Sequence, residues 1–88
     1  MKVEFRESFL KDLRVVNNKN LLSKVKAAIE NAEQAETLQA IIKLKKLKGS
    51  KDYFRIKLGD YRIGLKFEND TISFVRLLHR REIYRFFP

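Results

Sequence analysis

The chain contains no cysteine, and this absence excludes several kinds of chemistry. Without thiols there is no disulfide framework, no thiolate metal site and no thiol nucleophile, which fits a reducing compartment. The sequence also lacks an apolar run near the roughly 18 residues that span a bilayer, and "MKVEFRESF" has no apolar leader region. We therefore expect a cytoplasmic protein that does not associate with membranes.

Motifs for metal-dependent and acyl-transfer chemistry are missing as well. The sequence has only three glycines and forms no glycine-rich phosphate loop, no HExxH motif and no serine-centred hydrolase turn. No acidic pair with the spacing of a metal site occurs in its C-terminal part. We therefore expect neither a metal ion nor a cofactor.

Length and charge narrow the class of protein further. Eighty-eight residues, 44% of them hydrophobic, make a single folded domain over residues 1–88. The net charge is +9, and residues 43–88 carry thirteen Lys and Arg against five Asp and Glu. Such a field favours a polyanion, most often nucleic acid, although a basic solvated surface or an acidic protein partner would leave the same charge count.

The first half of the chain reads as a strand followed by two helices. "KVEF" alternates and predicts a strand with Val3 and Phe5 inward. "SFLKDLRVV" has helical spacing behind a Ser8 cap, and "NNKN" ends it with turn formers. Residues 20–35 place their apolar side chains on one stripe, which predicts a second amphipathic helix returning antiparallel to the first. We expect a helical hairpin here.

The connector over residues 36–52 is expected to be mostly loop. It carries the densest run of cations in the chain, formed by Lys43, Lys45, Lys46, Lys48 and Lys51. A solvated linker and an arm that contacts phosphates both account for this run.

Three strands are expected after the connector: "YFRIKL", "YRIGLKFE" and "TISFVRLL". Gly59-Asp60 and Asn69-Asp70 join them as two-residue hairpin turns. "RREIYRFFP" has helical spacing and predicts a short C-terminal helix. The predicted fold is α+β, with an N-terminal strand and a helical hairpin packed on one face of an antiparallel sheet (β-α-α-β-β-β and a short C-terminal helix).

The Gly59-Asp60 turn sets the register of the first hairpin. It places Lys57 opposite Arg62 and Arg55 opposite Gly64, with all four on one face. The apolar side chains point to the other face, toward the helices: Phe54, Ile56, Leu58, Tyr61, Ile63, Leu65 and Phe67. Because like charges directly opposite each other destabilise a hairpin by a few tenths of a kcal/mol, the cationic face predicts a function.

The second turn extends this register to the last strand. It predicts that Leu65 faces Phe74, that Arg62 faces Leu77, and that His79 lies on the cationic face. The same register sends Arg76 to the core face, so that either a bulge shifts the strand or this side chain reaches an edge.

A cationic face of this kind suits RNA cleavage in which a ribose 2′-hydroxyl attacks the adjacent phosphate. The reaction needs cations on the phosphate, a group that takes the hydroxyl proton and a group that protonates the leaving 5′-oxygen. Arg55, Lys57 and Arg62 suit the first task. An imidazole can both take and give a proton, so His79 suits either proton transfer, although a packed or exposed histidine is an equal explanation. Tyr84 stacks on a base, hydrogen-bonds the phosphate or simply packs in the C-terminal aromatic cluster.

"KLKG" followed by "YFRIKLGDYRIGLKFENDTISFVRLLHRREIYRFF" resembles the RelE/ParE superfamily of type II toxin–antitoxin systems, in its RelE-like branch. The "GDYRI" and "HRREIYR" blocks are the most specific parts of this resemblance. It implies a ribosome-dependent mRNA endonuclease that is metal-independent, cuts mRNA in the ribosomal A site by 2′-hydroxyl attack and contacts ribosomal RNA. It also implies a cognate antitoxin encoded beside the toxin, acidic and partly disordered when free.

The resemblance assigns roles to residues of the matching blocks. The catalytic set implied is Lys57, Arg62, His79, Arg80 and Tyr84. The RNA- or ribosome-binding set implied is Arg55, Lys45, Lys46, Lys48, Lys51, Arg81 and Arg85. An arginine stands at position 55 where the founding toxin has lysine, and a histidine stands in the shorter "HRREIY" block, which leaves Lys57, His79 and Tyr84 open as general base.

Two other functions stay open. The superfamily includes ParE toxins, which inhibit DNA gyrase and are not nucleases, and a basic binding module without activity would have the same charge. Growth arrest with mRNA cut inside codons separates the nuclease from both.

Overall fold

A computed structural model describes all 88 residues as a five-stranded sheet with helices on both faces. The strands lie in the order β1-β5-β4-β3-β2, and only the β1–β5 pair is parallel. The elements are β1 (Lys2–Phe5), α1 (Glu7–Arg14), α2 (Lys19–Gln34), the 3₁₀ helix η1 (Leu38–Ala40), β2 (Leu44–Lys46), β3 (Tyr53–Leu58), β4 (Tyr61–Glu68), β5 (Thr71–His79) and α3 (Ile83–Phe86). None of the helices has the length and apolar character that crossing a bilayer requires.

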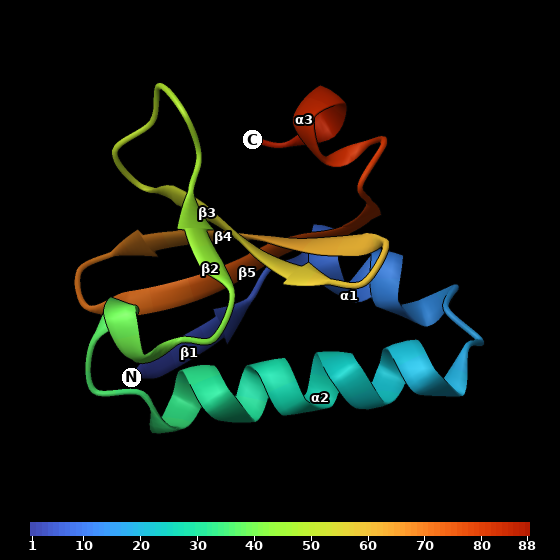
Figure 1. Ribbon diagram of the computed structural model, residues 1–88, viewed down its shortest axis with the longest axis horizontal. Helices are drawn as coiled ribbons and strands as arrows, with labels where there is room; N and C mark the ends of the chain where they lie inside the picture. Colours follow the sequence, from blue (N-terminus) through green and yellow to red (C-terminus); the bar gives the residue numbers. More distant parts are fainter.

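The arrangement in space confirms the predicted α+β fold. Figure 1 shows α2 along one face of the sheet and α3 on the opposite face, with α1 beside β5. Two features differ from the prediction. The connector forms β2 and η1 rather than only loop, because Leu44 and Lys46 pair with the open edge of β3. The N-terminal strand joins the meander in parallel, next to β5.

The first helix starts two residues earlier than its predicted Ser8 cap implies, and the second starts one residue earlier than predicted. The first helix begins at Glu7, so Ser8 is not its cap, and the Ser8 hydroxyl instead donates to the carbonyl of Val75. The second helix begins at Lys19 because the Asn18 side chain accepts a hydrogen bond from the Leu21 N–H at 3.1 Å.

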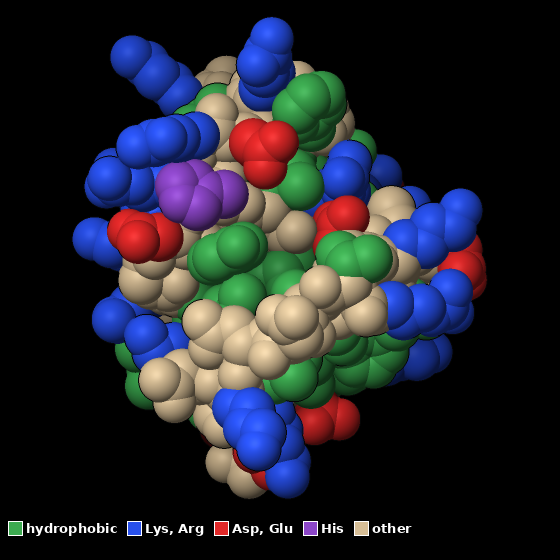
Figure 2. Space-filling view, turned by 90° about the vertical axis from the view of Figure 1, so that its right-hand side faces the viewer, with side chains coloured by type: hydrophobic (Ala, Val, Ile, Leu, Met, Phe, Trp, Pro, Cys, Tyr) green, Lys and Arg blue, Asp and Glu red, His purple; other side chains and the backbone are tan.

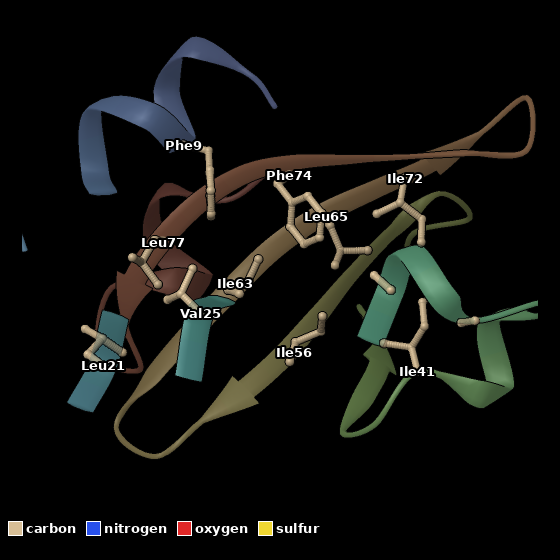
Figure 3. Close-up of a cluster of buried hydrophobic side chains, with 12 residues drawn as sticks. Phe9, Leu21, Val25, Ile41, Ile56, Ile63, Leu65, Ile72, Phe74 and Leu77 are labelled. Atoms are coloured by element: carbon tan, nitrogen blue, oxygen red, sulfur yellow. The ribbon is translucent and has the colours of Figure 1, made fainter. Parts of the chain in front are cut away.

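The main core lies between the sheet and the two long helices. In Figure 3, Phe9 comes from α1 and Leu21 and Val25 come from α2, and all three point at sheet residues. Every residue predicted for the inner face of β3 and β4 is buried in this cluster or packed against it. Val3 packs there too, whereas Phe5 lies at the sheet edge, stacked on Phe74 with ring centroids 5.4 Å apart.

The β3–β4 register is confirmed pair by pair, but the β4–β5 register shifts after Leu65 and Phe74. Val75 has no partner in the ladder, which makes it the extra residue of a β-bulge. From there on, Arg62 pairs with Leu78, whereas the predicted partner was Leu77. A one-residue shift moves every following side chain to the other face of the sheet.

The bulge and the sheet edge together account for Arg76. β1 pairs with β5 only as far as Phe74, and beyond that residue α1 lies along the edge of β5. There the Asp12 carboxylate accepts a hydrogen bond from the Leu77 N–H at 2.9 Å. The same carboxylate accepts from Nε and Nη2 of Arg76 at 2.8 and 3.1 Å. These hydrogen bonds and the negative charge of Asp12 raise the pKa of Arg76 above its ordinary value, against the opposing effect of burial. Arg76 therefore reaches the edge and stays out of the core.

Candidate functional site

The face of the sheet turned away from α2, here called the outer face, carries the predicted cations of β3 and β4. Lys57 and Arg62 are direct cross-strand neighbours there, and Arg55 lies opposite Gly64. Nη1 of Arg62 donates to the carbonyl oxygens of Gly59 at 2.7 Å and of Tyr61 at 2.9 Å, so the guanidinium is held against the β3–β4 turn. None of these three cations has a carboxylate within 4.0 Å.

Arg80 joins them at the same turn. Its backbone N–H donates to the Asp60 carbonyl at 2.7 Å, and its Nε lies 3.8 Å from the Asp60 carboxylate. Both side chains are more than half exposed, so this ion pair holds Arg80 only weakly. We call Lys57, Arg62 and Arg80 the turn cluster, because Arg62 and Arg80 both bond to residues of the Gly59-Asp60 turn and Lys57 is the ladder partner of Arg62.

The centre of the outer face is closed by the C-terminus. Phe87 is only 4% exposed and lies on Gly64, where an added Cβ would come within 2.7–2.8 Å of three ring carbons. The Tyr53 ring meets Phe87 edge-on at 5.4 Å, and Leu47 and Ile83 complete a second small core. The cationic face is therefore not one open surface, because at its centre Gly64 lies against the chain's own Phe87 ring.

His79 lies on the opposite face from the turn cluster. It pairs with Tyr61, whose side chain packs toward the main core, and the two rings meet edge-on at 5.4 Å. Its Nδ1 accepts a hydrogen bond from the Arg81 N–H at 3.2 Å, which closes the turn after β5. The prediction that His79 shares a face with Arg62 is wrong because the bulge at Val75 reverses the alternation. Figure 2 shows the histidine at the border of a basic region, beside a hollow of mixed side chains.

The remaining predicted site residues do not form one group. Lys45 lies on the outer face opposite Arg55, whereas Lys46 lies opposite the inward-facing Phe54. Tyr84 is 67% exposed on α3, where its neighbour Ile83 is buried instead. The other predicted cations are exposed in the β2–β3 loop and near the C-terminus: Lys48, Lys51, Arg81 and Arg85.

Two functional features escaped prediction from the sequence. Asp60 was read only as a turn former, yet its carbonyl accepts from the Arg80 N–H and its carboxylate lies 3.8 Å from Arg80 Nε, a pairing for which the sequence carries no local signal. The Nε of Arg55 is buried without a hydrogen-bond partner, and Nη1 of the same side chain reaches the Lys43 carbonyl only at 3.4 Å. A buried donor without a partner is a place where an anion gains a strong hydrogen bond. No group of three or more His, Cys, Asp or Glu side chains is arranged to hold a metal ion.

The fold and sequence match known toxins over nearly their whole length. Residues 3–84 match the family model for the ParE toxin of the type II toxin–antitoxin system parDE. Toxin RelE3 of Methanocaldococcus jannaschii is 42% identical over 89 residues and 100% of both chains. The putative toxin RelE1 of the same organism is 32% identical over 91% of this chain and 89% of its own.

Solved structures agree with these sequence matches. A chain of the RelB–RelE antitoxin–toxin complex from Methanococcus jannaschii superposes with a TM-score of 0.81 at 39% identity, covering 97% of this chain and 99% of that one. The RelE–RelB complex from Pyrococcus horikoshii shares the fold, with a TM-score of 0.72 at 22% identity over 90% and 93% of the two chains. The chain therefore belongs to the RelE/ParE superfamily of type II toxin–antitoxin systems, and it is a RelE-like toxin.

Proposed function

We propose that this toxin is a metal-independent endoribonuclease that cleaves mRNA in the ribosomal A site by attack of the 2′-hydroxyl on the adjacent phosphate. One observation carries the proposal: Lys57 and Arg62 oppose each other without a carboxylate counter-ion, and Arg80 is tied to the same turn. Lys57 and Arg62 repel each other across the ladder, and a bound phosphate offsets that repulsion.

Arg62 is the group best prepared to bind the scissile phosphate. Its guanidinium is already held by the carbonyl oxygens of Gly59 and Tyr61, so little side-chain entropy is lost when its other N–H groups bind phosphate oxygens. Arg80 is exposed and only weakly paired with Asp60, so it is free to turn toward the leaving 5′-oxygen. Both stabilise the charge that develops in the transition state.

In this proposal Lys57 first gives its own proton to water. As the neutral amine it then takes the proton of the 2′-hydroxyl while that oxygen bonds to phosphorus, and the 5′-oxygen leaves with a proton from water. His79 is on the other face of the sheet, and arginine does not lose its proton in proteins, so Lys57 is the one member of the turn cluster that can act as a base. Tyr84 makes no hydrogen bond and is exposed, which suits stacking on a nucleobase.

The wider basic surface contacts RNA outside the scissile bond. Arg55 and Lys45 extend the outer face away from the turn cluster. We assign flanking mRNA and ribosomal RNA contacts to these two and to the exposed cations Lys46, Lys48, Lys51, Arg81 and Arg85. A cognate antitoxin that is acidic and partly disordered when free would neutralise this surface and fold on it. RelB chains accompany the RelE toxins in the similar complexes.

The matched family model is that of ParE, which supports a gyrase inhibitor as the second candidate. Induction in bacteria without antitoxin separates the two, with Arg62→Ala and His79→Asn as variants. Under the nuclease proposal, wild type and His79→Asn arrest translation and leave mRNA cut inside codons, whereas Arg62→Ala loses roughly 10²-fold in cleavage rate. DNA damage with translation at first intact would favour the gyrase inhibitor, and undiminished cleavage by Arg62→Ala would remove the turn cluster from the site.

A further inference from the structure

A groove of about 250 Å³ lies between α2 and the end of β3. It exists because β2 covers β3 only from Phe54 to Ile56, which leaves the last residues of β3 without a neighbouring strand on that edge, although β4 pairs with them on the other. The last contact at this edge is a hydrogen bond from the Lys57 N–H to the Lys43 carbonyl, at 3.4 Å. Lys43 has a φ of 63°, and the backbone there turns away from β3. The opposite wall of the groove is formed by α2, which has small side chains there, such as Ala28.

The lining of this groove combines an apolar floor with a rim of one charge. Ala28, Ile42 and Leu58 contribute to the floor, and Ile42 is 65% exposed although it is a large apolar side chain. Lys24, Lys43 and Lys57 are its only charged residues, so no carboxylate balances them. An exposed apolar surface within a ring of lysines matches a peptide that carries both an apolar side chain and carboxylates.

We propose that this groove receives an acidic segment of the cognate antitoxin, which inserts an apolar side chain against Ile42 and Leu58. Carboxylates on either side of that anchor pair with Lys24, Lys43 and Lys57. The inference rests on the antitoxin partner proposed above and does not depend on the nuclease chemistry.

Lys57 connects the groove to the turn cluster. It lines the groove and is also the cross-strand neighbour of Arg62. A carboxylate that pairs with Lys57 from the groove therefore takes one cation away from the proposed catalytic set, even where the antitoxin leaves Arg62 uncovered. Occupation of the groove thus inhibits the toxin from the edge of the sheet.

A second apolar surface fits an acidic segment less well. It runs across α1 and α2 through Leu13, Leu22 and Ile29, and Glu30 and Glu33 border it. Those two carboxylates outnumber Lys26, the one basic residue of that surface, and repel an acidic chain, whereas the groove has three lysines and no carboxylate. The antitoxin segment therefore favours the groove.

Two pairs of variants test the groove with matched controls. Lys24→Glu and Ile42→Asp alter the groove, and Lys26→Glu and Leu22→Asp make the same changes on the second surface. None of these residues belongs to the turn cluster, so every variant should remain toxic when expressed alone. Affinity for the protein encoded directly beside this chain is measured by calorimetry in an Arg62→Ala background, with circular dichroism to verify folding. Growth rescue on co-expression is measured without that background.

We expect both groove variants to bind at least about tenfold more weakly, equivalent to about 1.4 kcal/mol, and to escape rescue, while the controls bind within about twofold of wild type. Wild-type affinity in the groove variants, or weakening confined to the controls, would overturn the assignment. If the neighbouring protein does not bind wild type, the partner and the groove assignment both fail. The cleavage test uses no antitoxin, so its outcome is separate.

Discussion

Replacing Gly64 by alanine tests whether the C-terminal aromatic ring closes the outer face. The added Cβ would lie 2.7–2.8 Å from three ring carbons of Phe87, a distance at which something must move. The ring has little room because it is 4% exposed and meets Tyr53 edge-on. Overpacking of this kind lowers the free energy of unfolding by about 1–3 kcal/mol. Phe87→Ala alone should lower it by about 3 kcal/mol, the lower end for a phenylalanine in a small core.

The double variant separates a clash from a general loss of stability. With the Phe87 ring gone, Gly64→Ala meets no obstacle, and alanine is favoured over glycine within a strand by about 0.5–1 kcal/mol. We therefore expect the double variant to lose about 2–2.5 kcal/mol, whereas independent effects would add to about 4–6 kcal/mol. The coupling between the two positions would then be at least about 1 kcal/mol.

Urea unfolding followed by circular dichroism measures all four proteins, each in an Arg62→Ala background so that the host cell is not arrested. The control cycle pairs Gly64→Ala with Phe86→Ala, because Phe86 is 51% exposed beside the buried ring. That control should be additive. Additivity to within about 0.5 kcal/mol in the Phe87 cycle as well would refute the packing of Phe87 on Gly64.

Two further predictions concern the sheet edge and the turn cluster. Asp12→Ala removes the acceptor of the Arg76 guanidinium and of the Leu77 N–H, so urea unfolding should show a loss of about 2–3 kcal/mol, and less for Asp12→Asn, which keeps an acceptor. An equal loss in both would show that the oxygen acceptor is unimportant. Lys57→Gln should reduce the dependence of log K on log salt by about 0.7 in single-stranded RNA binding measured by fluorescence anisotropy, whereas Lys26→Gln should leave it unchanged. Equal slopes for the two variants would contradict RNA contact by Lys57.

Local turn chemistry made the β3–β4 hairpin predictable. The Gly59-Asp60 pair permits a two-residue turn, with Gly59 at a φ of 59°, and Asn69 and Asp70 both adopt positive φ in the second turn. Once the turn length is known, alternation places every side chain of the hairpin, including Lys57 opposite Arg62. The cationic pair at the centre of the proposed site therefore followed from residues close together in the sequence.

The closing of the outer face could not be predicted in this way. Phe87 and Gly64 are far apart in the sequence, and neither has a local signal for the other. A glycine in a strand fits a bulge, a bound ligand or a neighbouring ring equally well. The edge strand β2 was missed for a similar reason, because "LKK" becomes a strand only through pairing with β3.

The bulge at Val75 decides both the core and the site. Without it, Arg76 would point into the core and Leu77 would face the cations, whereas the observed register buries Leu77 to 4% exposure and lets Arg76 reach Asp12. The bulge costs some ladder hydrogen bonds. It gains more free energy than it loses, because it buries a leucine and lets the arginine pair with a carboxylate. The same shift takes His79 away from Arg62. Under the nuclease proposal, cleavage therefore falls to the turn cluster, and Lys57 takes the role of general base that the sequence left open among Lys57, His79 and Tyr84.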